Sequence, residues 1–405
     1  MVGTGTVEFM NFPTNVLVIG GGRWSRVLVG VLCELAPPAV NLFVHSPSNA
    51  AAMSEWASMR GIGTRLKVSS FFPGQLAGAS SAIIVANAAC DHEMSVERAL
   101  CLGAPVLVEK PIALNFSSAR RLAELARMQN ARLAAANVFL FAGYVERFSK
   151  IVAESPGLRS VRVRWSDPRT EIRHGEAKSY DPALPVYADW LPHIISVLTA
   201  LAGSRPIRCK KVNVMRGGAE LEIDLMLGTT PCSIALARNG SSRKRRFEVE
   251  AGRNIATLDF SEEPGTIGLD STSECADPCW ASHPKPVSRM LTAFLEGASS
   301  GVWDDRLDVS IGLRACDVIE QVSHLYRTAL LPWLSQRLLA GENDDDLRYA
   351  LSEILLSEDP HSKVALAEKI EYVFHKIRMR ASPFSQNGSL SDDPVGVLRS
   401  IAQQM

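Results

Sequence analysis

The stretch NVLVIGGGRWSRVL, residues 15–28, decides the fold that we predict for the first part of the chain. A mostly apolar run is followed by three glycines, and the residues after them carry apolar side chains at helical spacing. This order predicts a strand, a tight turn and a helix. Because glycine has no Cβ, a turn of this kind lets other groups come close to the backbone.

The alternation of strand and helix continues beyond this stretch. Apolar, β-branched runs predict further strands at 41–45, 80–88 and 106–110. Amphipathic patterns predict helices over 51–61, 90–103 and 117–130, the last with Ser117 or Ser118 as its cap. Strands that alternate with helices at this pitch predict a parallel, doubly wound sheet, that is, a Rossmann domain over residues 13–135.

After about residue 135 the pattern changes to strands that alternate apolar and polar residues, typical of an antiparallel sheet with one wet face. We expect six such strands, one helix near 187–202, a long loop over 262–284, and helices over 287–298 and 308–328. The predicted domains are therefore an open antiparallel α+β domain at 136–330 and a helical C-terminal extension at 331–405.

Charge and composition favour a small-molecule partner. Lys+Arg and Asp+Glu are both 43, so no net charge attracts the protein to nucleic acid or to an anionic membrane. No apolar run approaches the roughly 20 residues of a membrane helix. The start MVGTGTVEFMNFP lacks the features of a signal peptide, and the eight cysteines are scattered, so we expect a cytoplasmic protein.

The glycine turn is placed where dinucleotides bind. Gly20 and Gly22 open a G-x-G-x-x-G pattern whose third position is Ser25, a small substitute. A pyrophosphate would rest there on the N-terminus of the following helix. The second strand ends at Ser46 without the carboxylate that usually holds the ribose of NAD, and Arg23 could pair with a 2′-phosphate. We therefore favour NADP(H) over NAD(H); the alternative is that Arg23 only faces solvent.

Two short motifs carry candidate chemistry. Glu109 and Lys110 lie where a buried strand ends at Pro111, although a surface ion pair would give the same dipeptide. Asp189 and His193 are four residues apart and share one helix face, where a carboxylate can orient an imidazole as proton donor or acceptor. On its own, this second pattern favours the simpler interpretation of a capping Asp and an incidental His.

The glycine turn, the EKP motif and D-x-x-x-H occur in the order in which the glucose–fructose oxidoreductase/inositol dehydrogenase family (Gfo/Idh/MocA) has them. The segments IIVANAACDHEMSVERAL, NVFLFAGYVERFSK and DRLDVSIGLRACDVIEQVSHL also resemble it, so the likeness covers roughly 14–328. The resemblance implies hydride transfer, with Lys110 at the nicotinamide ribose and the reacting atom, His193 as general acid/base and Asp189 as its partner. It also implies that His92 follows the loop beneath the nicotinamide, and it is consistent with a homodimer. The predicted cofactor residues are Gly20, Gly22, Arg23, Trp24, Ser25, Ser46, Asn87, His92, Glu109 and Lys110.

The chain departs from the family around Asp189, where larger apolar residues replace the usual glycines. Phe139, Tyr144, Tyr187 and Trp190 could add aromatic surface for a substrate, although core packing is the commoner role of such residues. We therefore expect an NADPH-dependent reductase of an imine or ketone in a biosynthetic pathway. The alternatives are a sugar or cyclitol dehydrogenase of the same family, and a silent NADP-binding sensor or scaffold whose tail docks a pathway partner.

Two further patterns give weaker evidence for function. Cys275, Cys279 and His283 have no evident fourth ligand and prolines interrupt them, so we expect no metal site. The basic run RKRR, 243–246, is expected to be a solvated hairpin loop.

Overall fold

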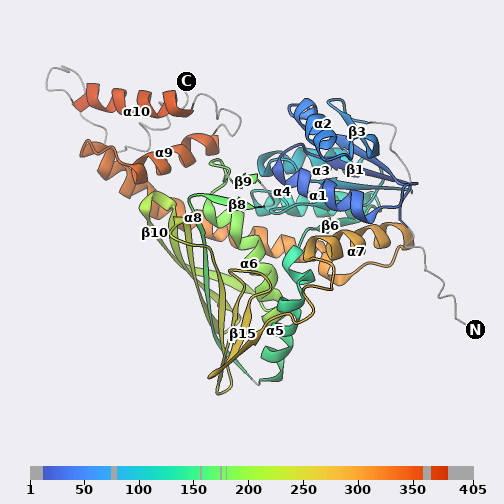
Figure 1. The fold of residues 1–405 in the computed structure, drawn as a ribbon. Helices are drawn as coiled ribbons and strands as arrows, with labels where there is room; N and C mark the ends of the chain where they lie inside the picture. Colours follow the sequence, from blue (N-terminus) through green and yellow to red (C-terminus); the bar gives the residue numbers. More distant parts are fainter. Residues whose placement is uncertain are drawn as a thin grey trace, which may run out of the picture. The chain divides into compact units, whose positions relative to one another are not determined.

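A computed structural model of the chain describes residues 12–73, 80–155, 157–173, 176–178, 180–358 and 366–381 (Figure 1). The chain divides into two compact units, each discontinuous in sequence. The first unit comprises Met1–Glu146, Ile195–Ala200 and Pro278–Cys316, and the second comprises Arg147–Ile194, Leu201–Asp277 and Asp317–Met405. Among the residues described, no helix combines the length and apolar character needed to cross a bilayer.

The first unit is built on a six-stranded parallel sheet with the strand order β3-β2-β1-β4-β5-β6, the order of a Rossmann sheet. The strands are β1 (Asn15–Ile19), β2 (Asn41–His45), β3 (Leu66–Ser69), β4 (Ser81–Val85), β5 (Val106–Val108) and β6 (Leu133–Ala135). The predicted parallel sheet is confirmed. The short strands β3 and β6 were not predicted.

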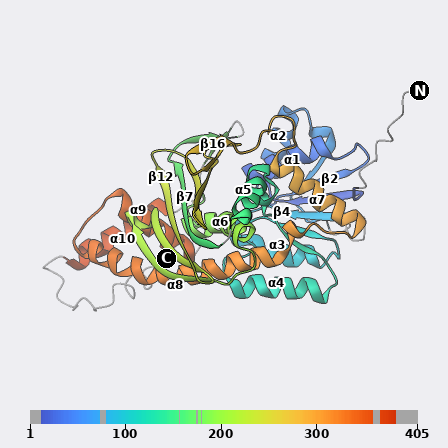
Figure 2. The same cartoon turned by 90° about the horizontal axis from the view of Figure 1, so that it is seen from below.

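Helices cover both faces of this sheet (Figure 2). They are α1 (Arg23–Leu35), α2 (Ala50–Met59), α3 (His92–Leu100), α4 (Phe116–Met128) and α7 (Pro286–Ser300). Val16 and Val18 of β1 pack with α1, α2 and α7, whereas Leu17 and Ile19 pack with α3 and α4. The central strands β1, β4, β5 and β6 are buried on both sides, which explains why they are mostly apolar. Burying both faces provides the driving force for this layered unit.

The cap of α4 differs from the prediction. Asn115, rather than Ser117 or Ser118, is the N-cap, and its side chain accepts a hydrogen bond from the Ser118 backbone N–H at 2.8 Å. The Ser117 hydroxyl donates to the same Asn115 oxygen, also at 2.8 Å. The orphan N–H group of Ser118 is therefore satisfied by Asn115, two residues upstream of Ser117.

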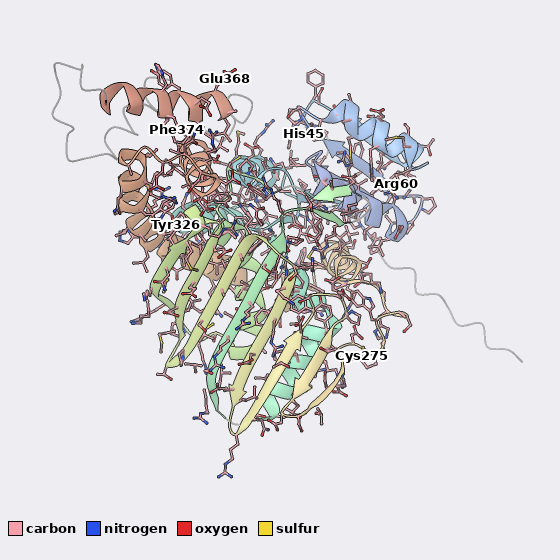
Figure 3. The ribbon with its side chains drawn as sticks, turned by 60° about the vertical axis from the view of Figure 1, so that its left-hand side comes forward. His45, Arg60, Cys275, Tyr326, Glu368 and Phe374 are labelled. Atoms are coloured by element: carbon pink, nitrogen blue, oxygen red, sulfur yellow. The ribbon has the colours of Figure 1, made fainter. Side chains whose placement is uncertain are left out.

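The second unit contains an eight-stranded sheet of order β10-β11-β12-β7-β13-β14-β15-β16 (Figure 3). Its strands are β7 (Leu158–Pro168), β10 (Ile207–Met215), β11 (Glu220–Leu227), β12 (Thr230–Gly240), β13 (Lys244–Ala251), β14 (Asn254–Asp259), β15 (Thr266–Leu269) and β16 (Thr272–Cys275). All neighbours are antiparallel except β12 and β7, which pair in parallel. The predicted antiparallel sheet is confirmed in this mostly antiparallel form.

Several expectations for this part of the chain were wrong. The predicted loop over 262–284 contains the hairpin β15–β16, and a further hairpin joins β8 (Glu171–Arg173) to β9 (Glu176–Lys178). Helix α5 (Gly143–Glu154) was not predicted, because its apolar residues also fit an extended crossover segment. Helix α6 (Val186–Ala202) has nearly the expected bounds.

The helices that follow extend beyond the predicted boundaries. Helix α8 (Val309–Leu339) runs without interruption through residue 330, where we placed the start of the extension. Helices α9 (Asp345–Glu358) and α10 (Leu366–Ala381) lie within the predicted helical extension. The remainder of the predicted extension, 382–405, lies outside the described residues.

The turn η4 (Arg216–Gly218) between β10 and β11 receives α9. Gly217 and Gly218 have φ angles of +64° and +99°. A Cβ on Gly217 would lie 2.0 Å from the Asp346 carbonyl oxygen, and one on Gly218 would lie 2.0 Å from the Tyr326 hydroxyl. Glycine at 217 therefore allows α9 to approach this closely, and glycine at 218 does the same for Tyr326 of α8.

Glu353 of α9 is buried on the inner side of this packing, 5% exposed. Burial raises the pKa of Glu353 to about 7, while Tyr326 and the guanidinium groups of Arg238 and Arg327 act in the opposite direction. Tyr326, labelled in Figure 3, is itself buried in α8.

The cap of α4 gives a stability prediction. Asn115→Ala should lower the free energy of unfolding by about 1 kcal/mol, because the Ser118 N–H loses its acceptor. Thermal denaturation should show a Tm lower by about 2–4 °C. Ser118→Ala keeps the backbone N–H and is the matched control, with a shift less than half as large. Equal shifts in the two variants would place the cap elsewhere.

Glu353 gives a pH prediction. With its pKa raised to about 7, the folded chain holds a proton that the unfolded chain releases above the ordinary value of 4.5. Stability should therefore fall as the pH rises from about 4.5 to 7 and then level off. Glu353→Gln removes this term, so its Tm should match wild type at pH 5 and exceed it at pH 8. The gain at pH 8 amounts to at most about 3 kcal/mol. A Tm difference that is the same at both pH values would contradict the assignment.

Candidate functional site

The glycine turn between β1 and α1 is a point of very close approach. Gly20 has a φ of +138°, and a Cβ on it would lie 2.5 Å from the Ser25 hydroxyl and 2.6 Å from the Ala86 carbonyl oxygen. A Cβ on Gly21 would lie 2.4 Å from the hydroxyl of Ser46. These two glycines are therefore required by the packing of the β1–α1 turn against the ends of β4 and β2.

Ser25 has a packing role at the third position of the motif. Its side chain is fully buried, and its hydroxyl donates a hydrogen bond to the Ala86 carbonyl at 2.8 Å. The small side chain lets α1 lie close to the end of β4, which is the structural purpose of the third glycine in such motifs. The contact with Ala86 shows that Ser25 shapes the turn, and its predicted role toward a cofactor stays a prediction.

The N-terminus of α1 has the features of a pyrophosphate cradle. Gly22 is the N-cap and is exposed, no atom lies within 4 Å of a Cβ built on it, and no side chain of the described residues caps the helix there. The first helical bond runs from the Arg26 N–H to the Gly22 carbonyl, so the earlier N–H groups point out of the helix. Arg23 Nη1 finds no hydrogen-bond partner within the described parts of the chain. These residues fit a dinucleotide phosphate.

The end of β2 carries hydroxyl and imidazole groups. Ser46 is buried, and its hydroxyl accepts a hydrogen bond from the Asn49 N–H at 3.2 Å. His45 packs edge-on against Phe72, with ring centroids 5.2 Å apart, and burial lowers the pKa of His45. The guanidinium of Arg98 lies 4.5 Å from the Phe72 ring centroid.

Phe72 and Arg98 were missed by the sequence analysis. Phe72 follows β3 and Arg98 lies in α3, and only the folding of the sheet brings the two residues near the end of β2. No local motif marks either residue, so nothing in the sequence alone could have identified them.

His92 ties together the loops that follow β4 and β5. Its ring is buried, with Nδ1 2.7 Å from the Pro111 carbonyl oxygen and Nε2 3.3 Å from that of Asn87. Burial lowers the pKa of His92, which favours the neutral ring, and a neutral imidazole donates one proton. The Asn87 amide donates to the Ser95 hydroxyl at 2.8 Å. The loop containing Lys110 is thus held in place by a predicted site residue.

The EKP motif at the end of β5 separates two differently exposed charges. Glu109 is 7% exposed, whereas Lys110 is only partly buried. Burial raises the pKa of Glu109, and the indole N–H of Trp24 and the charge of Lys110 act against that rise. Glu109 is thus an internal anchor between α1 and the β5 loop, and Lys110 is the accessible group of the motif.

In the second unit, Asp189 and His193 lie on α6, as predicted. The His193 ring stacks on Trp165 of β7, with centroids 6.0 Å apart and planes inclined by 16°. The Asp189 carboxylate accepts a hydrogen bond from Arg238 Nη2 at 3.2 Å. Both side chains are partly exposed, so they keep access to a ligand.

Arg238 is the main residue here that the sequence analysis missed. It lies in β12 and is 2% exposed, and its Nη1 donates to the Leu184 carbonyl at 3.0 Å and to the Tyr349 hydroxyl at 3.1 Å. The guanidinium carbon lies 4.6 Å from the ring centroid of Tyr180. Arginine is common in strands that have one solvent-exposed face, so the sequence held no signal that Arg238 is buried and bonds Asp189.

The four aromatic residues predicted for substrate binding are buried in their own units. Phe139 and Tyr144 are 8% and 0% exposed in the first unit. In the second unit the Tyr187 hydroxyl donates to that of Ser323 at 3.1 Å, and the Trp190 ring faces the guanidinium groups of Arg238 and Arg245. These positions are those of packing residues, and their role toward a substrate stays a prediction.

Two weaker expectations can be compared with the structure. No group of three metal-ligating side chains occurs among the described residues. The basic run 243–246 is not a solvated loop, because β13 begins at Lys244 and Arg245 is buried, paired with Asp167 at 2.5 Å. Burial lowers the pKa of Arg245 to about 10, opposed by the Asp167 charge.

Comparisons with known proteins agree with this geometry. A model of the Gfo/Idh/MocA group, described as an oxidoreductase family with an NAD-binding Rossmann fold, matches residues 14–137. No curated protein matches the chain.

Solved structures share the fold at low identity. UDP-N-acetylglucosamine 3-dehydrogenase GnnA from Acidithiobacillus ferrooxidans is 19% identical, with a TM-score of 0.64 over 78% of this chain and 99% of its own. GenD2 from gentamicin A biosynthesis, in complex with NAD, is 18% identical, with a TM-score of 0.64 over 81% and 97%. KijD10, a 3-ketoreductase from Actinomadura kijaniata in complex with TDP-benzene and NADP, is 17% identical, with a TM-score of 0.60 over 77% and 97%.

The family match over 14–137, the Rossmann strand order and the open N-terminus of α1 agree with one another. Residues 14–137 match the Gfo/Idh/MocA oxidoreductase family with its NAD-binding Rossmann fold, and the chain shares its fold with solved oxidoreductases.

Proposed function

We propose that the protein is an NADP(H)-dependent reductase that transfers hydride to a C=O or C=N carbon of a small metabolite. The observation that carries the cofactor choice is the environment of the α1 N-terminus. Arg23 and Ser46 stand there, and the segment His45–Asn49 after β2 has no carboxylate to accept a ribose 2′-OH. A guanidinium and hydroxyl groups suit a 2′-phosphate.

The nicotinamide, when bound, supplies the hydride, and the chain supplies proton and charge. Hydride adds to the carbon while the double-bond oxygen or nitrogen takes a proton, giving an alcohol or an amine. Lys110, the accessible cation of the EKP motif, is proposed to stabilise the negative charge that develops on that atom. The Glu109 and His92 contacts hold its loop, which supports a role for Lys110 as a group positioned in advance of the reaction.

His193 is proposed to be the proton donor. Its ring is supported on one face by Trp165 and remains partly exposed. Asp189 is proposed to bind a polar group of the substrate or to orient the imidazole, and its carboxylate is fixed by Arg238. Retention of a lysine, an aspartate and a histidine in these roles favours an enzyme over a silent cofactor-binding protein.

The substrate is proposed to be a ketone or an imine. Aromatic surface around Asp189 was one reason to prefer an imine or ketone to a sugar. Tyr187 and Trp190 are buried and used in packing, so this reason against a sugar is weaker. The structurally similar proteins include one named as a UDP-sugar dehydrogenase and one named as a 3-ketoreductase. A 3-keto sugar linked to a nucleotide therefore belongs in the same substrate panel as cyclic imines and simple ketones.

Arg23 gives a test of cofactor choice by fluorescence titration. Arg23→Ala should weaken NADPH binding by about 10–100-fold, because a charged hydrogen bond to phosphate is lost. NADH affinity should change by less than about threefold, since NADH has no 2′-phosphate. The control is Arg60→Ala. Arg60 is an exposed arginine that follows α2 and is labelled in Figure 3. Equal weakening for both cofactors would show that Arg23 does not read the 2′-phosphate.

Turnover with the substrate panel tests the catalytic roles. Lys110→Ala and His193→Ala should each lower kcat by about 10²–10³-fold, as expected for the loss of a charge stabiliser or a proton donor. Lys210→Ala, an exposed lysine of β10, should leave the rate unchanged. If His193→Ala bound NADPH normally and turned over at the wild-type rate, the proton-donor role would be wrong. Wild-type binding of NADPH without any turnover would favour the silent sensor or scaffold.

A further inference from the structure

The C-terminal helix α9 reaches the environment of Asp189. Its N-terminal half is docked on η4, where Gly217 allows close contact with Asp346 and Arg216 pairs with Asp346 at 3.7 Å. One turn further along, Tyr349 points its hydroxyl at the guanidinium of Arg238, 3.1 Å away. The helix therefore supplies a polar group to a buried residue of the sheet.

Arg238 connects three elements through one rigid group. Its two terminal nitrogens bond Asp189 of α6, the carbonyl of Leu184 before α6, and Tyr349 of α9. A guanidinium is planar, so two hydrogen bonds at one terminal nitrogen fix the plane of the group and with it the direction of the other terminal nitrogen. The Leu184 and Tyr349 contacts fix Nη1, and Nη2 is then aimed at the Asp189 carboxylate.

The surroundings of Arg238 favour a single orientation of this side chain. The side chain is 3% exposed, and the rings of Tyr180 and Trp190 lie 4.6 and 5.9 Å from the guanidinium carbon. Few alternative partners exist for a buried cation, and loss of one acceptor there is costly. A change at Tyr349 is thus transmitted to Asp189 and is not absorbed by solvent.

We propose that Arg238, held by Tyr349 of α9, is a positioning residue that fixes the Asp189 carboxylate, which makes the C-terminal extension a working part of the site. The inference rests on the proposed function for its effect on turnover. Its physical core, the coupling of Tyr349 to Asp189 through Arg238, can be measured without a substrate.

The experiment compares Tyr349→Phe, Asp189→Asn and the double variant in the full-length protein. Tyr349→Phe keeps the ring and removes only the hydroxyl that Arg238 bonds. We expect it to lower kcat/KM by about 3–10-fold, the range that follows from loss of one buried hydrogen bond, with NADPH affinity unchanged. In the Asp189→Asn background, Tyr349→Phe should lower kcat/KM by less than twofold, because the carboxylate that Arg238 positions has been replaced by an uncharged amide.

Arg348→Gln is the matched control on the same helix. Arg348 pairs with Glu371 of α10 at 2.7 Å, so its loss perturbs the outer side of α9 but not Arg238. This variant should keep kcat/KM within twofold of wild type. A loss as large as that of Tyr349→Phe would mean that α9 acts only as a general support, which would overturn the proposal.

Thermal unfolding separates this inference from the proposed function. It is measured for wild type, Tyr349→Phe, Asp189→Asn and the double variant. The Tm decrease caused by Tyr349→Phe should be at least halved in the Asp189→Asn background. Additive decreases would overturn the coupling, even if wild-type turnover were found. Non-additive decreases without any wild-type turnover would support the coupling and count against the reductase instead.

Discussion

The close approach of the β1–α1 turn to the ends of β4 and β2 is the constraint on which the first unit depends. At Gly20 the backbone lies so near Ala86 that a Cβ would clash with its carbonyl group. Ser25 then bonds the same carbonyl from the first turn of α1. Because the turn is this tight, α1 starts directly at the sheet edge, and its first N–H groups are directed toward the space where a phosphate can bind.

The same edge of the sheet is stabilised by contacts between loops. His92 links the segments after β4 and β5 through two carbonyl groups, and burial favours its neutral ring. Glu109 is anchored beneath Lys110 beside the indole of Trp24. Residues that a motif search would assign to ligand binding thus also hold the scaffold. A substitution at His92 or Glu109 would change the position of Lys110 as well as any direct contact with the cofactor.

The second unit relies on buried charged groups with assigned partners. Arg245 pairs with Asp167, Arg238 bonds Asp189 and Tyr349, and Glu353 lies among tyrosines and arginines of α8 and β12. Burial of a charge is unfavourable unless partners compensate for the lost hydration. These pairings therefore restrict α6, α9 and the sheet to one mutual arrangement within the unit, more specifically than apolar packing does. They also extend the surroundings of Asp189 into the C-terminal part of the chain.

The sequence by itself determined the features that depend on local order. The strand–glycine–helix pattern at 15–28 and the alternating strands after about residue 135 predicted the Rossmann sheet and the antiparallel sheet. The EKP and D-x-x-x-H motifs placed Lys110 at a strand end and Asp189 and His193 on one helix. Local periodicity is sufficient for these, because a strand or helix of normal length shows its buried face in its own residues. It failed for short or ambiguous segments such as α5 and the β15–β16 hairpin. Only the tertiary structure decided the partners: Ala86 for Ser25, Phe72 and Arg98 near His45, and Arg238 with Tyr349 beside Asp189. These residues come from strands and helices far apart in sequence, and a contact between distant segments depends on how the sheets and helices pack, which no single stretch of sequence encodes.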